Sequence, residues 1–183
     1  MLSAPSSRKD AHSSEQPTRA ESTRIAIDEA TRRLIESDAE PRWGKFLRAW
    51  EALAAARGAY PARADVDPFQ LGTALLPNIF LVDIVDGPRM NTRFRFRLLG
   101  QVIQDRETTR PGAYLDELGS VADIAEIERH YRATMAGDIW IRTASLVWND
   151  AHKDMFKYSV LMLPLADDGV TVTHLVGLAL YNF

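Results

Sequence analysis

The chain has 183 residues, 46% of them hydrophobic, and a formal net charge of −3 at pH 7. This length and composition predict one globular domain with a tail. The slight acidic excess argues against a general nucleic-acid binder, which needs surplus basic residues to neutralise phosphates. The absence of cysteine excludes a disulfide scaffold, a zinc–thiolate site, a cysteine nucleophile and flavin photochemistry through a cysteine adduct.

Residues 1–22 are polar and rich in Ser, Pro, Arg and Glu. Such a segment buries too little apolar surface to order itself, so we predict a disordered tail. It also lacks the apolar stretch of a secretion signal. The longest apolar region, residues 174–183, is too short to span a membrane. We therefore predict a cytoplasmic protein.

Helical patterns follow this tail. Apolar residues recur at helical spacing over residues 23–37 and again over residues 42–57, and Gly58 ends the second helix. We assign these two helices to an N-terminal unit, residues 23–58. Asp67 before Pro68 predicts the start of a short helix that Pro77 closes.

The remaining chain is dominated by strand patterns. The segments 78–85 and 93–100 are predicted to form a hairpin around a turn at Asp86-Gly87-Pro88. The polar stretch 101–118 predicts short helices or loops. A helix is expected at 121–135, and three further strands are expected at 139–148, 155–165 and 171–183.

This element order predicts an α+β fold, a five-stranded antiparallel sheet with helices on one face. In the strand at 155–165 both sets of alternating side chains are largely apolar. A sheet with one face in water alternates more cleanly. The second face is therefore covered by the N-terminal helix carrying Trp43, Phe46 and Trp50, by a second copy of the chain, or by both.

Residues 42–183 contain a series of short motifs: Trp50, Arg57-Gly58, Pro61-Ala62-Arg63-Ala64-Asp65-Val66-Asp67-Pro68, Leu76-Pro77, Phe80-Leu81-Val82-Asp83, Phe94-Arg95-Phe96-Arg97-Leu98, Gly100, Leu163-Pro164-Leu165 and Asp168-Gly169. With these motifs the segment resembles a bacterial stand-alone PAS (Per-Arnt-Sim) domain family. The resemblance implies a PAS-like domain at residues 59–183. It further implies a sensory or regulatory binding module in which the sheet and the central helices enclose a small cavity.

Strand parity and analogy to this fold select four aromatic residues as candidates for lining a ligand pocket: Phe96, Tyr131, Trp140 and Tyr158. His130 lies in the helix that carries the axial ligand in haem-binding PAS domains, so it is a haem-ligand candidate. The alternative is a partly exposed helix residue without a cofactor. Non-covalent flavin binding also stays open. The four histidines are far apart in the sequence, and we predict no metal site.

Arg93, Arg95 and Arg97 share one side of a strand. They form a candidate surface for an anion or an acidic partner, or they make cross-strand ion pairs with acids such as Asp83. Asp67 is better explained as a helix cap than as half of an acid–base pair. No nucleophile motif is present, so no catalytic residue is predicted.

The sequence therefore predicts a non-enzymatic sensory or regulatory module. It would bind a small ligand, a protein partner or both, form a homodimer and signal through protein–protein contacts. Two alternatives stay open. One is a small cavity-containing hydrolase or isomerase with His130 or an aspartate as base, and the other is a dimerisation adaptor without a ligand.

Overall fold

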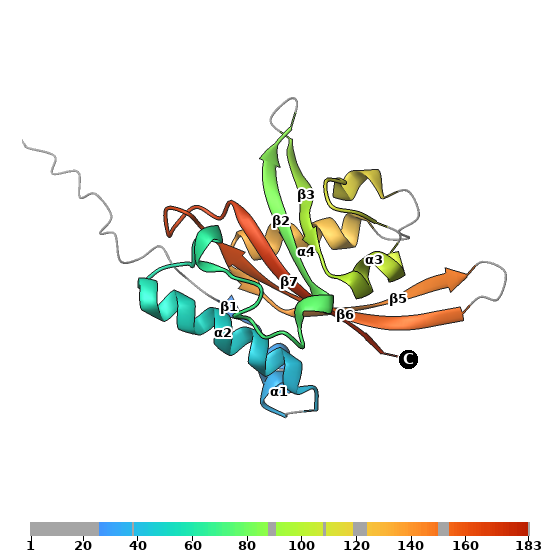
Figure 1. Ribbon diagram of the computed structural model, residues 1–183, viewed down its shortest axis with the longest axis horizontal. Helices are drawn as coiled ribbons and strands as arrows, with labels where there is room; N and C mark the ends of the chain where they lie inside the picture. Colours follow the sequence, from blue (N-terminus) through green and yellow to red (C-terminus); the bar gives the residue numbers. More distant parts are fainter. Residues whose placement is uncertain are drawn as a thin grey trace, which may run out of the picture.

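The computed structural model describes residues 26–37, 39–87, 91–107, 109–118, 124–149 and 154–182. The predicted tail, residues 1–22, lies outside this part of the chain. The elements follow one another as β1 (Ala26–Ile27), α1 (Glu29–Glu36), α2 (Pro41–Arg57), η1 (Arg63–Asp65), η2 (Leu76–Asn78), β2 (Ile79–Asp86), β3 (Thr92–Leu99), α3 (Gln101–Glu107), η4 (Leu115–Glu117), α4 (Ile124–Met135), β4 (Asp138–Ile139), β5 (Ile141–Asn149), β6 (Asp154–Leu165) and β7 (His174–Asn182) (Figure 1).

A five-stranded sheet forms the centre of the molecule, with strand order β3-β2-β7-β6-β5. Every neighbouring pair is antiparallel. The α+β class and the antiparallel five-stranded sheet predicted from the sequence are confirmed. Strands β2, β6 and β7 carry most of the core residues, because each contributes apolar side chains to both faces.

Helix α2 covers one face of the sheet. We call this layer the α2-side core, built from Trp43, Phe46, Leu47, Trp50, Ile79, Leu81, Leu161, Leu163, Leu165, Val176, Leu178 and Leu180, with further side chains around them. The indole Nε1 of Trp50 donates a hydrogen bond of 2.9 Å to the carbonyl oxygen of Pro164 on β6. The predicted covering of this face by the helix with Trp43, Phe46 and Trp50 is confirmed.

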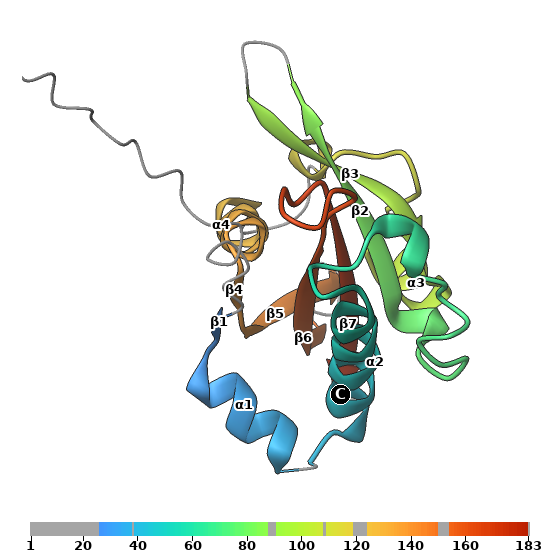
Figure 2. The ribbon, with the colours of Figure 1, turned by 90° about the vertical axis from the view of Figure 1, so that its left-hand side faces the viewer.

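Helices α3 and α4 and the turn η4 cover the opposite face. This layer, the α4-side core, contains Phe80, Val82, Phe94, Phe96, Leu99, Ile103, Leu115, Ile127, Tyr131, Tyr158, Val160, Met162, Leu175 and Ala179. Figure 2 shows α2 and α4 on opposite sides of β6 and β7. Gly177 is required here, because a Cβ atom at this position would come within 2.1 Å of the Phe80 ring.

Two elements differ from the sequence prediction. Residues 26 and 27 were expected to be helical, but they form β1, which pairs in parallel with β4. Asp28 then caps α1, since its carboxylate accepts hydrogen bonds from the backbone N–H groups of Ala30 and Thr31. A two-residue strand carries no periodicity, so its partner, far along the chain, decides its conformation.

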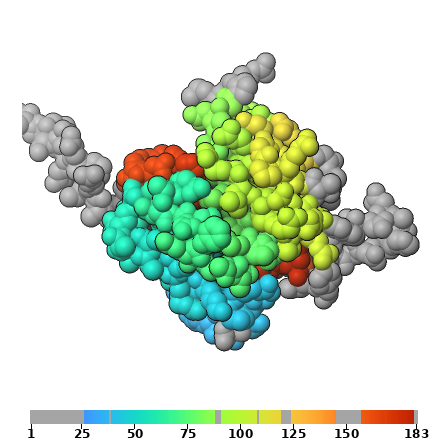
Figure 3. Space-filling model, viewed as in Figure 1, coloured from blue at the N-terminus to red at the C-terminus, as the bar shows by residue number. Residues whose placement is uncertain are grey.

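The short helix expected after Asp67 is a series of turns. The Asp67 carboxylate accepts from the backbone N–H of Phe69 at 2.9 Å, as a cap would. Gly72 then adopts a left-handed φ of 115°, which a continuing helix does not allow. Figure 3 shows the connection from α2 to β2, coloured teal to green, at the surface next to α1 and α2.

No helix in the described part of the chain is long and apolar enough to cross a membrane.

Replacing Trp50 by alanine should lower the free energy of unfolding by about 3 to 5 kcal/mol, because it leaves a cavity beneath α2 and an unpaired carbonyl. Urea unfolding measures the change. Glu51, exposed on the same helix, gives the matched control, and Glu51→Ala should stay within about 0.5 kcal/mol of wild type. A Trp50→Ala cost as small as that of the control would show that α2 does not hold the sheet.

Candidate functional site

Five polar or amphipathic side chains meet in and beside the α4-side core. We call Glu107, Tyr131, Arg142, Tyr158 and Tyr181 the polar cluster. They come from α3, α4, β5, β6 and β7 respectively. Sheet register brings three of them together, because Tyr158 pairs with Tyr181 across β6 and β7 and with Ala144 across β5 and β6. Arg142, two residues before Ala144, shares its side of the sheet.

Hydrogen bonds and ring contacts link four members of the cluster one after another, from Arg142 to Glu107. Arg142 Nη2 donates to the Tyr158 hydroxyl at 2.8 Å, and its guanidinium carbon lies 5.1 Å from the Tyr158 ring centroid. The rings of Tyr158 and Tyr181 stack with centroids 5.9 Å apart. The Tyr181 hydroxyl in turn donates to Glu107 Oε1 at 2.7 Å. The cluster therefore connects the end of α3 to the edge strand β5.

Burial controls the charge states of this cluster. Desolvation raises the pKa of Glu107 above its usual value, although the Tyr181 hydrogen bond and the Arg142 charge act in the opposite direction. Desolvation also raises the pKa of Tyr158, Tyr131 and Tyr181. The three phenols therefore stay protonated at neutral pH and can donate hydrogen bonds.

Arg142 is the cationic group of the cluster. Its side chain is 6% exposed, yet among the described residues no carboxylate lies within salt-bridge distance of it. Its Nε–H is buried without a hydrogen-bond partner in the structure. Burying a guanidinium without a counter-ion and with an unpaired N–H costs folding free energy, unless another group supplies the acceptor and the negative charge.

His130 is completely buried on α4, which corrects the expectation of a partly exposed helix residue. Its Nε2 lies 3.1 Å from the carbonyl oxygen of Trp140, and its ring stacks obliquely on Trp140 at a centroid distance of 4.6 Å. Burial, followed by the charge of Arg142, lowers the pKa of His130 to about 3. The ring is therefore neutral, with Nε2 as donor.

Of the two ring nitrogens of His130, Nδ1 is the one that lacks a hydrogen-bond partner in the structure. A haem iron would have to bind this nitrogen, because Nε2 is held by the backbone. The haem assignment stays a prediction. In the described residues no group of three or more His, Cys, Asp or Glu side chains could hold a metal ion.

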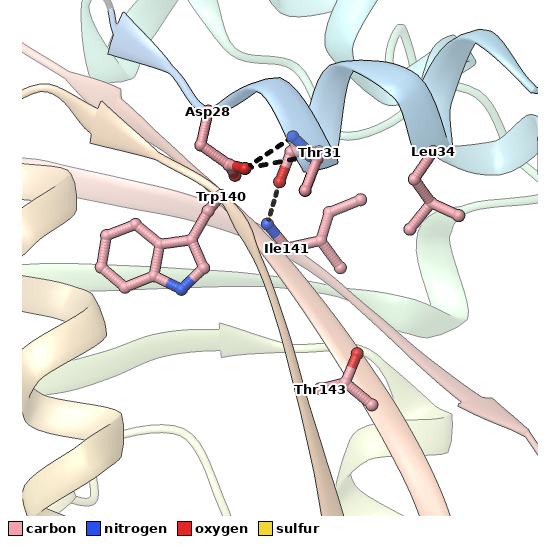
Figure 4. A pocket seen from close by; sticks show the side chains of 7 residues that line it. Asp28, Thr31, Leu34, Trp140, Ile141 and Thr143 are labelled. Atoms are coloured by element: carbon pink, nitrogen blue, oxygen red, sulfur yellow. Dashed lines mark hydrogen bonds between the residues drawn. The ribbon is translucent and has the colours of Figure 1, made fainter.

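Three of the four predicted pocket residues, Phe96, Tyr131 and Tyr158, lie in the α4-side core. Trp140 does not join them. It borders a separate open groove of about 300 Å³ between α1 and β5. Figure 4 shows this groove, where the backbone N–H of Ile141 donates to Thr31 Oγ1 at 2.7 Å. The ligand-lining role of all four residues stays a prediction.

Sequence reasoning missed Glu107, Arg142 and Tyr181. Arg142 carried a usable signal, since it shares strand parity with Trp140 and Ala144, but a charged strand residue ordinarily indicates a solvent-facing side. Glu107 lay in a polar stretch with no periodicity. Its inward position depends on where α3 ends, which the sequence alone does not show.

The three arginines of β3 lie on the side of the sheet away from the polar cluster. Arg95 and Arg97 share the buried carboxylate of Asp83, at 2.8 Å and 2.6 Å. Arg93 pairs with Asp116 and Glu117 at 2.7 Å and 2.9 Å. The cross-strand pairs with Asp83 are thus present. Binding of an anion or an acidic partner by these arginines stays a prediction.

His130 should make stability depend on pH. Its folded pKa of about 3 lies below the ordinary value of 6.5, so the unfolded chain takes up the proton first. This contribution to stability is complete above pH 6.5 and is lost as the pH falls toward 3. Between pH 6.5 and 4.5, wild type should lose about 2 kcal/mol more than His130→Gln, as measured by urea unfolding at each pH. Parallel pH profiles would contradict the buried neutral histidine.

One family of known proteins matches most of this chain. The family model described as PAS domain matches residues 40–180, and no curated protein matches the chain. Among solved structures, the Rhodobacter sphaeroides LOV protein aligns with a TM-score of 0.41 and 13% identity, covering 60% of this chain and 64% of that one. The chain thus spans less than two thirds of that protein.

Two further structures are similar at the same level. A light-oxygen-voltage domain probed with a flavin analogue has a TM-score of 0.37 and 15% identity, over 58% of this chain and 78% of that chain. The PAS domain of Bordetella pertussis BvgS has a TM-score of 0.33 and 15% identity, over 57% of this chain and 74% of that chain. The match of the family model over most of the sequence shows that this chain belongs to the PAS domain family of sensory modules.

Proposed function

We propose that this chain is a sensor that binds a small molecule at the polar cluster and signals through protein–protein contacts. The observation that carries the proposal is the buried Nε of Arg142, which has no hydrogen-bond partner in the structure. Among the described residues, three other buried side-chain atoms share this condition: His130 Nδ1, Thr109 Oγ1 and, on η1, Arg63 Nε. The great majority of buried polar atoms in proteins are hydrogen-bonded. A bound molecule would supply the missing partner of Arg142 Nε.

The packing of the sheet offers a route for the signal. Residues 158 and 160 on β6 lie on the α4 side of the sheet, where residue 158 belongs to the polar cluster, and residues 161 and 163 lie on the α2 side. A ligand that shifts β6 would therefore shift the surface on which Trp50 packs. Different positions of α2 would present different surfaces to a partner, so the ligand would shift a population between two states.

The homodimer predicted from the sequence is part of this proposal. Trp43, Phe46 and Trp50 are buried against the chain's own sheet, so they are not available to a second copy. A dimer or a signalling partner would instead contact the outer surface of the N-terminal helices, where Leu34 is 40% exposed. The cytoplasmic location predicted above completes the proposal.

The proposal excludes an enzymatic role for His130. A general base works best when its pKa is close to the working pH. The pKa of His130, about 3, and the engagement of its Nε2 by Trp140 make it a poor base. Glu107 bonds to a tyrosine hydroxyl rather than to a nucleophile with an adjacent base. A sensory role without catalysis therefore fits these residues better than the hydrolase or isomerase alternative.

Native mass spectrometry of the purified chain tests the proposal. We expect excess mass on each folded chain that disappears on denaturation, because a small molecule co-purifies. Tyr181→Phe removes the hydroxyl that bonds Glu107 and should reduce the occupied fraction at least several-fold. Tyr60→Phe, in the α2-side core, is the matched control and should keep the mass.

Two results would contradict the proposal. A folded chain with no added mass, which also fails to bind any compound of a metabolite panel, would favour the adaptor without a ligand. Turnover of a panel compound would favour the enzyme.

A further inference from the structure

We propose that the ligand of the polar cluster is a small monocarboxylic acid with an apolar body, whose carboxylate binds the Arg142 guanidinium. This inference rests on the proposed function, because it names the ligand class for the same site. Arg142 is the residue that selects the anion.

The first argument is the unbalanced charge of Arg142. Arginine stays protonated in proteins, and Arg142 is buried, with 6% of its surface exposed. One hydroxyl, that of Tyr158, is its hydrogen-bond acceptor among the described residues. Its Nε–H has none. A carboxylate beside Nε would supply both the acceptor and the counter-charge, in the forked geometry that arginine and carboxylates prefer. Because this Nε atom is buried, the neighbouring side chains have to move apart when the ligand binds.

Glu107 does not remove this requirement. The charge of Glu107 acts on neighbouring groups, but no Glu107 oxygen lies within salt-bridge distance of the Arg142 nitrogens. One Glu107 oxygen instead accepts a hydrogen bond from the Tyr181 hydroxyl. Burial raises the pKa of Glu107, so its charge is a weaker counter-charge than that of an exposed carboxylate. No other carboxylate of the described residues lies within salt-bridge distance of Arg142.

The surroundings of the guanidinium define the rest of the ligand. Tyr158 and Tyr181 present a stacked pair of rings. On the same side of the sheet, Arg142 pairs with Val160 across β5 and β6, and Val160 pairs with Ala179 across β6 and β7. These side chains favour an aromatic or aliphatic body. A phosphate or a dicarboxylate would bring a second negative charge into this core, where Arg142 is the single cationic side chain of the cluster. A monoanion therefore matches the site in charge.

The experiment compares acids with their neutral amides. Protein freed of small molecules by unfolding in urea and refolding is mixed with benzoate, phenylacetate or hexanoate, and in parallel with benzamide, phenylacetamide or hexanamide. Thermal unfolding is the readout. At a hundred times its Kd, a bound acid should raise Tm by about 5 to 10 °C. We expect at least one acid of the panel to do so and its amide to have no effect.

Two arginine variants make the assignment specific. Arg142→Met should abolish the effect of the acid. It should also raise the Tm of the ligand-free protein by about 2 °C or more, because it removes a buried charge that lacks a partner. Arg48, exposed on α2, gives the matched control, and Arg48→Met should retain the response to the acid.

The outcomes separate this inference from the proposed function. Equal shifts with an acid and its amide, or an acid response that survives in Arg142→Met, would overturn the carboxylate assignment and leave the ligand sensor standing. A co-purified molecule identified by its mass as neutral would do the same. No response to any probe would overturn the assignment, and if the purified chain also carries no added mass, the proposed function falls with it.

Discussion

The structure depends on one constraint: the central strands β2, β6 and β7 are apolar on both faces. Each strand therefore needs a covering layer on either side, since exposing either set of side chains to water would forfeit the main source of folding free energy. Helix α2 supplies one layer, and α3, α4 and η4 supply the other. The N-terminal helices are thus as much a part of the domain as the sheet is, because without α2 the α2-side core would lie open.

The two layers have different chemistry, and this difference separates their roles. The α2-side core is almost entirely apolar, and the hydrogen bond from Trp50 to Pro164 joins α2 to β6 within it. The α4-side core borders Glu107, Arg142 and His130, each of which costs free energy to bury. Ionisable groups retained in a core at such a cost are often functional. In the proposed sensor, the ligand therefore binds on the α4 side, and the movement that it causes takes place on the α2 side.

The periodicity of apolar residues in the sequence predicted most of the fold. Alternating apolar residues located the strands, and the doubly apolar pattern of residues 155–165 predicted a second covering layer. The exceptions are segments governed by distant contacts or by a single residue: β1 depends on β4, and Gly72 turns the chain where a helix was expected. Strand parity placed Phe96 and Tyr158 on the α4 side, where their ligand-lining role stays a prediction. It did not indicate Arg142, because a charged strand residue ordinarily faces water. Its burial depends on the elements that cover the α4 side of the sheet, which strand parity alone does not show.

The most direct test of the account observes the Arg142 Nε–H group itself. In ¹H–¹⁵N spectra of the uniformly labelled chain, the Nε–H signal that is missing from Arg142→Met identifies this group. On titration with a carboxylic acid that stabilises the protein, this signal should move to higher proton frequency, because Nε–H gains a charged acceptor, while the Nε–H signals of exposed arginines stay in place. An unchanged Arg142 signal in the saturated complex would contradict the account, since the ligand would then be held by other groups.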